Sequence, residues 1–140
     1  RAALFAPWTR RGAQQSLGAA TASAEAAARA VGGVLLPVGA AWAAALEADP
    51  TAPLYAGDAY HPAPAGTMLA ALTIYQRLFG EDVRNLPAHL LTRVPGLGLS
   101  AGEVEALAAA AHAAAGGRPP DPATPVPADT TRSSPGSGPC

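Results

Sequence analysis

Apolar residues gather in two short runs on either side of an alanine-rich segment in the first third of the chain. Residues 4–6 form an apolar run that ends before a proline, which predicts the end of a buried strand. Residues 34–36 show no polar alternation, as expected of a strand covered on both faces. Between them, residues 14–31 carry Glu25 and Arg29 four positions apart, a spacing that favours a helix. This order predicts a βαβ unit and a fold of the α/β class.

Two further helices are predicted on either side of a loop rich in proline and glycine. Residues 39–48 place Trp42 and Leu46 on one face and are followed by Asp-Pro, which stops a helix. Residues 67–79 form the second, whose apolar positions recur at helical spacing: Met68, Leu72, Tyr75 and Phe79.

The region after residue 80 holds one more predicted helix and then a segment of very different composition. Ser100 and Glu103 have the S-x-x-E spacing of a capping box, which predicts a helix through Ala115. This helix has little besides Val104 and Leu107 to bury, so it is expected to pack loosely. Residues 116–140 are dominated by proline, glycine, serine and threonine, a composition that predicts disorder.

The loop of residues 50–64 carries the most informative chemistry. Asp58 lies three residues before His61, so its carboxylate can accept the Nδ1 hydrogen and leave Nε2 free to take a proton from a nucleophile. Pro62 disfavours helical backbone at His61 and keeps the imidazole in the loop. His61 is therefore the candidate general base and Asp58 its orienting carboxylate. Tyr60, between them, is a candidate for lining a substrate cleft, although a packed loop aromatic fits it equally well.

The remaining aromatic and histidine side chains are expected to have structural roles. Trp8 and Trp42 are predicted to pack in the core or at a cleft rim. His89 is interpreted as a connector residue, and His112 as one position on a helix surface, because neither has a carboxylate or cysteine at ligand spacing.

Composition excludes several classes of function. The chain has 140 residues, enough for at most one ordinary domain, and a net charge of −1, which gives no electrostatic case for binding nucleic acid or an anionic membrane. No stretch approaches the ~18–20 apolar residues that span a bilayer. The single cysteine, Cys140, has no disulfide partner in the chain. A metal site at Asp58 and His61 would need a third ligand, which the sequence does not offer, and no cofactor motif is present.

The motif Asp-x-x-His-Pro, followed by a glycine-containing loop and a helix, resembles the final sequence block of the SGNH (GDSL-type) hydrolases. Three other segments are similar to parts of the same family: residues 4–11 to a late strand and Trp-Arg turn, residues 34–42 to the next strand, and residues 97–105 to a C-terminal helical extension. The resemblance implies the C-terminal portion of a flavodoxin-like α/β/α sandwich. It assigns residues 1–80 to the hydrolase domain, 81–115 to the extension and 116–140 to a tail.

The resemblance also implies a reaction and a missing component. In this family an Asp and a His complete a Ser-His-Asp triad that hydrolyses esters through an acyl-enzyme, without a cofactor, and Asp58 and His61 match those two positions. The family's Gly-Asp-Ser, oxyanion-hole glycine and Gly-x-Asn-Asp blocks are absent from these 140 residues. We therefore expect the C-terminal half of an enzyme acting on small-molecule, lipid or carbohydrate esters. The N-terminal half would be its partner, and this chain alone is expected to be inactive.

Two interpretations from other classes stay open at this point. The chain could be a non-catalytic interaction fragment that binds a separate nucleophile-bearing chain. Alternatively, its alanine-rich helices could form a small helical module, which would gain support if residues 4–6 and 34–36 were not paired strands. The sequence does not indicate the acyl or alcohol group of a substrate, the cellular compartment or the oligomeric state.

Overall fold

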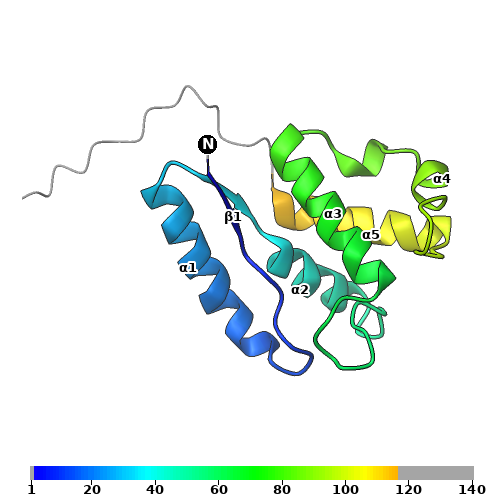
Figure 1. Ribbon diagram of the computed structural model, residues 1–140, viewed down its shortest axis with the longest axis horizontal. Coiled ribbons are helices and arrows are strands. Elements are labelled where there is room, and N and C mark those ends of the chain that lie inside the picture. Colours follow the sequence, from blue (N-terminus) through cyan, green and yellow to red (C-terminus); the bar gives the residue numbers. More distant parts are fainter. Residues whose placement is uncertain (1, 117–140) are drawn as a thin grey trace, which may run out of the picture.

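The computed structural model describes residues 2–116, and its chain begins with the predicted strand–helix–strand unit (Figure 1). Strand β1 (Ala3–Phe5) pairs in parallel with strand β2 (Val34–Leu36). The connection between them contains a short 3₁₀ helix, Gln14–Ser16, and helix α1 (Leu17–Ala30). The mixed α/β class predicted from the sequence is therefore confirmed.

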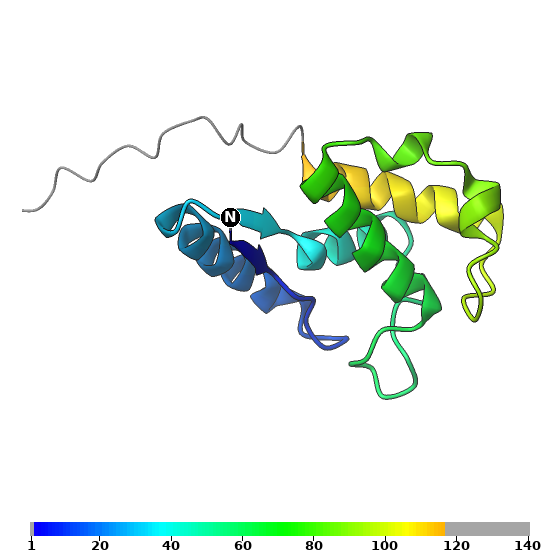
Figure 2. The ribbon, with the colours of Figure 1, turned by 45° about the horizontal axis from the view of Figure 1, so that its top comes forward.

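The other helices follow β2, and most of them lie away from α1, although α2 also contacts it (Figures 1 and 2). They are α2 (Val38–Ala48), α3 (Pro64–Phe79), the short α4 (Ala88–Leu91) and α5 (Ala101–Ala115), with a 3₁₀ turn at Val83–Asn85. Helix α5 packs against both α2 and α3, and α3 also contacts β2. None of the helices within residues 2–116 is long and apolar enough to cross a membrane.

Helix α5 is buried far more extensively than its sequence predicts, and the expectation of loose packing was wrong. Val104 and Leu107 are buried, and so are four of its alanines: Ala108, Ala110, Ala111 and Ala115. Because alanine has no long side chain, neighbouring helices approach this face closely and cover it. Buried residues of α2, α3 and α5 belong to one hydrophobic core. The division into residues 1–80 and 81–115 stays a prediction.

Strand β1 is more exposed than predicted, while β2 matches its prediction. Val34 and Leu36 are buried, as expected of a covered strand. In β1, however, Leu4 is only half-buried and the side chain of Phe5 is 45% exposed. Within residues 2–116, β2 is the only strand that pairs with β1, so one edge of β1 stays open. The strand also starts one residue before the predicted run.

Helix α3 buries polar side chains that the apolar spacing did not reveal. Of the expected face, Met68 and Leu72 are buried, but Phe79 is 65% exposed. Thr73 and Gln76 are buried instead. The Thr73 hydroxyl donates to a carbonyl one turn earlier in α3 at 2.8 Å, which removes the cost of burying it.

The ends of two helices agree with their sequence signals. Gly80 follows α3 with φ +73°, the left-handed conformation that commonly ends helices. Ser100 and Glu103 form the predicted capping box: the serine hydroxyl accepts from the Glu103 amide at 3.3 Å, and the glutamate accepts from the Ser100 amide at 2.8 Å. Apart from Gly116, the segment predicted to be disordered lies outside the described residues.

Candidate active site

The segment that carries Asp58 and His61 is a closed loop whose two ends are tied together. Tyr55 and Pro62 form an antiparallel bridge, and the amide of Ala56 donates to the carbonyl of His61 at 2.8 Å. The bridge and the hydrogen bond both join the two ends of the loop, so residues 56–61 are held as one turn before α3 begins. The imidazole therefore projects from a closed turn.

Asp58 organises this turn with both of its carboxylate oxygens. Oδ1 accepts hydrogen bonds from the amides of Tyr60 at 3.0 Å and His61 at 2.9 Å, while Oδ2 bonds to Nδ1 of His61. Ala59, inside the turn, has φ +60°, a left-handed conformation that is uncommon outside glycine. The contact predicted between the Asp58 carboxylate and Nδ1 is thus confirmed.

The same hydrogen bonds fix the protonation state of Asp58. The bond to the His61 ring, followed by the bonds from the two amides, holds the pKa of the Asp58 carboxyl well below its usual range. Asp58 is therefore ionised at neutral pH and can only accept a hydrogen bond. In the neutral imidazole, the hydrogen must then reside on Nδ1, which leaves a free electron pair on Nε2.

The loop is anchored to the segment that leaves the carboxyl end of β1. The indole Nε1 of Trp8 donates to the carbonyl of Tyr60 at 2.9 Å, and the amide of Arg11 donates to the carbonyl of Ala59 at 2.9 Å. These two contacts place the loop beyond the carboxyl ends of the strands, as predicted. Functional groups of open parallel sheets gather at that edge.

Aromatic rings pack around Trp8, the side chain that anchors the loop. The rings of Trp8 and Trp42 are stacked with centroids 4.4 Å apart, and Tyr55 meets Trp42 edge-on at 6.0 Å. The Tyr55 hydroxyl donates to the carbonyl of Thr9 at 2.9 Å, and burial raises the pKa of this phenol. The packing roles predicted for both tryptophans are confirmed. Trp8 also serves as a loop anchor, a role that sequence reasoning missed.

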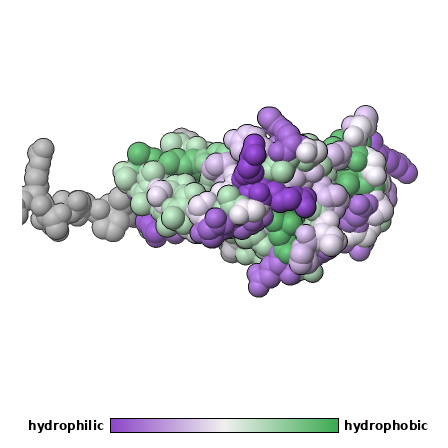
Figure 3. All heavy atoms as spheres, turned by 90° about the horizontal axis from the view of Figure 1, so that it is seen from below, coloured by the Kyte–Doolittle hydropathy of each residue, from purple (hydrophilic) through white to green (hydrophobic). Residues whose placement is uncertain are grey.

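The side chain of His61 is open to solvent. Figure 3 shows hydrophilic side chains gathered near the centre of one face of the molecule. The His61 side chain is 70% exposed, and no residue among 2–116 hydrogen-bonds its Nε2. Tyr60 is half exposed and meets the imidazole edge-on, with ring centroids 5.3 Å apart. A reacting group can therefore approach Nε2 from outside, with Tyr60 beside it. Whether Tyr60 contacts substrate stays a prediction.

The described residues hold no metal site, and two of their three serines serve local structure. The hydroxyl of Ser16 donates to a backbone carbonyl at 2.8 Å, and that of Ser100 belongs to the capping box, so both serve local structure. Within residues 2–116, no group of three or more histidine, cysteine or acidic residues could hold a metal ion. Within residues 2–116, the candidate site therefore consists of the Asp58–His61 pair.

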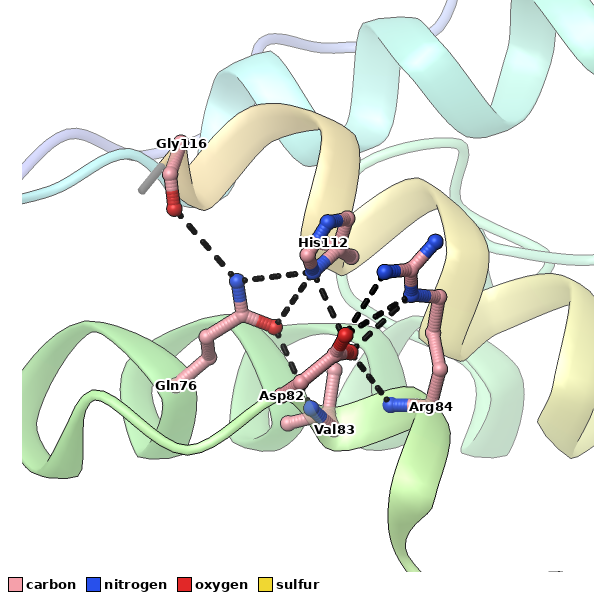
Figure 4. A network of polar contacts seen from close by, with 6 residues as sticks. All are labelled: Gln76, Asp82, Val83, Arg84, His112 and Gly116. Atoms are coloured by element: carbon pink, nitrogen blue, oxygen red, sulfur yellow. Dashed lines mark hydrogen bonds and ion pairs between the residues drawn. The ribbon is translucent and has the colours of Figure 1, made fainter. Parts of the chain in front are cut away.

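A second histidine–carboxylate contact exists, and it corrects the interpretation of His112 as a plain surface position (Figure 4). Nδ1 of His112 lies 3.1 Å from Oδ1 of Asp82 and 3.1 Å from Nε2 of Gln76. Arg84 binds the same carboxylate through two nitrogens and holds the pKa of Asp82 well below its usual range. The buried Gln76 also accepts from the amide of Val83 at 3.2 Å.

This second cluster joins α3, the following 3₁₀ turn and α5. His112 is half-buried, and its Nδ1 is already in contact with both Asp82 and Gln76. His89, in contrast, is exposed on α4, as expected of a connector residue. Of the three histidines, only His61 combines an oriented Nδ1 with an exposed ring at the carboxyl edge of the sheet.

Comparisons with protein-family models, with curated proteins and with solved structures found no match for this chain. The functional interpretation therefore depends on the residues and their geometry alone.

Replacing Asp58 with asparagine should change which nitrogen of His61 carries the hydrogen. The carboxamide can donate to Nδ1, which favours the Nε2–H tautomer, whereas the wild-type carboxylate favours Nδ1–H. Imidazole ¹⁵N NMR on the neutral ring distinguishes the two forms. Asp82→Asn, which alters the other histidine–carboxylate pair, should leave His61 unchanged. A wild-type His61 that is mainly the Nε2–H tautomer would contradict the assignment of Asp58 as its orienting group.

Proposed function

We propose that this chain supplies the acid–base pair of an SGNH-type serine ester hydrolase. The observation that carries the proposal is the pairing of an ionised Asp58 with Nδ1 of His61, while Nε2 is exposed at the carboxyl edge of a parallel sheet. The nucleophilic serine and the oxyanion donors would come from a polypeptide segment other than these residues.

In each half of this reaction, His61 takes up one proton and gives one back. As the serine Oγ attacks the ester carbonyl carbon, Nε2 takes the hydroxyl proton, and Asp58 stabilises the resulting imidazolium. The imidazolium then protonates the departing alcohol oxygen while the C–O bond breaks, leaving an acyl-serine. In the second half, Nε2 takes a proton from water, the hydroxide attacks the acyl carbon, and the serine oxygen leaves with the proton returned by His61.

We also propose that β1 and β2 are two strands of a flavodoxin-like α/β/α sandwich. The amide of Val34 donates to the carbonyl of Ala2 at 2.8 Å, and the amide of Ala6 donates to the carbonyl of Leu36 at 3.0 Å. Because backbone groups alternate in direction along a strand, the odd-numbered residues of β1 present theirs to the opposite edge. That edge is suited to a further parallel strand.

The two alternative functions are supported less well. The helical module would have gained support from unpaired segments in place of β1 and β2, and these strands are paired. A non-catalytic interaction fragment would give no reason for the Asp58–His61 pair to lie exposed in a closed loop. Esters of small molecules, lipids or carbohydrates therefore remain the proposed substrates.

The coding sequence around this chain provides the test. We expect a Gly-Asp-Ser motif in frame with it or in an adjacent gene, and the polypeptide that contains both parts should hydrolyse p-nitrophenyl acetate. Its serine should also react with a fluorophosphonate probe, whereas the 140-residue chain alone should show neither activity. The proposal is wrong if the combined polypeptide folds and reacts with neither reagent.

A further inference from the structure

The turn that follows β1 carries two adjacent arginines, Arg10 and Arg11, and it lies beside the loop of residues 56–61. The amide of Arg11 donates to the carbonyl of Ala59, a residue of that loop, at 2.9 Å. Both views of the ribbon show the turn and the loop side by side, beyond the carboxyl ends of the strands (Figures 1 and 2). Two positive charges are therefore carried at the same edge of the sheet as the candidate general base.

The side chain of Arg11 lies over an aromatic ring that belongs to the base of the same loop. Its guanidinium carbon is 5.1 Å from the centroid of the Tyr55 ring, within the ~6 Å of a cation–π contact. Tyr55 is buried and forms the antiparallel bridge with Pro62, the residue that follows His61. Because this ring is held in place, the guanidinium above it has a defined position next to the loop.

Neither Arg10 nor Arg11 has an anionic partner within residues 2–116. In that part of the chain, the arginines that form ion pairs are Arg29 and Arg84. Arg10 and Arg11 are exposed, and no residue there accepts a hydrogen bond from the guanidinium of Arg11. The carboxylate of the neighbouring loop, Asp58, is already bonded within its own turn. An adjacent pair of positive charges without a counter-ion attracts anions to this edge of the sheet.

We propose that Arg11, supported by the charge of Arg10, binds an anionic oxygen group of the ester while His61 acts on the ester bond. The inference rests on the proposed function and narrows its substrates to small esters that carry a carboxylate or a phosphate. The guanidinium offers a planar fork of N–H donors that matches two oxygens of either group. A neutral ester of similar size lacks this contact. Arg11 would thus determine specificity without taking part in the chemical step.

The test compares charged and neutral esters in the polypeptide that combines this chain with its nucleophile-bearing part. With the charge on the alcohol side, p-acetoxybenzoate and p-acetoxyphenyl phosphate are compared with methyl p-acetoxybenzoate. With the charge on the acyl side, mono-p-nitrophenyl suberate is compared with p-nitrophenyl octanoate. The ratio of kcat/KM for the charged ester to kcat/KM for the neutral ester is measured in the wild type and in Arg11→Gln. Because this ratio does not depend on the folded fraction, partial unfolding of the variant cannot imitate the effect.

For at least one charged ester, Arg11→Gln should lower this ratio by about fivefold, the size of effect expected of an exposed charge contact. The wild-type ratio for that ester should also fall as salt is added. The ester with the largest loss identifies the anionic group and the side of the ester that carries it. Arg29→Gln provides the matched control, because Arg29 is exposed at the end of α1, at the opposite edge of the sheet, and should leave the ratios unchanged. Equal ratios in the wild type and Arg11→Gln for every charged ester would show that Arg10 and Arg11 form only a solvated turn.

The same measurements separate failure of this inference from failure of the proposed function. Hydrolysis that is lost in His61→Ala, but whose ratios do not respond to Arg11→Gln, would overturn the anion site and leave the hydrolase intact. A folded combined polypeptide that hydrolyses none of these esters would overturn both.

Discussion

Replacing His61 with alanine will lower kcat for ester hydrolysis by about 10²- to 10⁴-fold in the polypeptide that combines this chain with its nucleophile-bearing part. The methyl group cannot take the serine proton during attack or return it to the leaving alcohol, so both halves of the reaction lose their acid–base catalyst. KM should change little, because His61 acts on the reacting atoms. The measurement is steady-state hydrolysis of p-nitrophenyl acetate.

The other two histidines provide matched controls. His89→Ala, at an exposed position of α4, should leave both kcat and stability near those of the wild type. His112→Ala removes the contacts with Asp82 and Gln76, so it should lower the thermal midpoint while the folded fraction keeps its turnover. Equal losses of turnover in all three variants would indicate a general folding defect. Full activity in His61→Ala would remove the catalytic assignment.

Gly66→Ala should lower the free energy of unfolding by about 3 kcal/mol, although replacing glycine with alanine in a helix ordinarily stabilises it. A Cβ atom at this position would lie 2.3 Å from the carbonyl oxygen of Leu54 and 2.6 Å from two ring atoms of Trp42. Both neighbours are buried, so neither can move aside cheaply. Because the same Leu54 carbonyl accepts from the amide of Ala63 at 2.9 Å, the strain should also reach the His61 loop.

Two other helical glycines serve as controls for this prediction. At Gly18 in α1 and Gly102 in α5, an added Cβ atom would have no neighbour within 4 Å, so the alanine variants should be stabilised by about 0.4–1 kcal/mol. Urea denaturation of the three variants gives the comparison, and amide shifts in residues 56–61 should appear only for Gly66→Ala. A stabilising effect at all three positions would show that α3 does not approach α2 as closely as described.

The features predicted correctly from the sequence are those that depend on local spacing. The Asp58–His61 contact joins residues three positions apart, and the capping box at Ser100 does the same. Paired strands around α1 follow from two apolar runs with an alanine-rich segment between them. In each case, a few neighbouring side chains carry enough information, because turn and helix geometry bring them together.

The features that were missed depend on contacts between distant segments. Trp8 anchors the loop through the carbonyl of Tyr60, 52 positions away, and no local pattern signals this bond. His112 meets Asp82 only because α5 folds back along α3. The burial of α5 was underestimated because hydropathy patterns give little weight to alanine. Gly66 was a sequence signal of the close approach between α3 and Trp42 of α2, because glycine has no Cβ atom and lets other groups come near its backbone.

The closed turn of residues 56–61 bears on how a complete active site would come together. Inside the turn, Asp58 accepts hydrogen bonds from the amides of Tyr60 and His61. The residue that anchors the turn from outside, Trp8, lies on the segment after β1. The imidazole is thus positioned before any nucleophile-bearing segment arrives. Such a segment would meet a preorganised surface, and association would not bear the entropic cost of ordering this loop. Assembly from two separately folded pieces would then resemble rigid docking more than coupled folding.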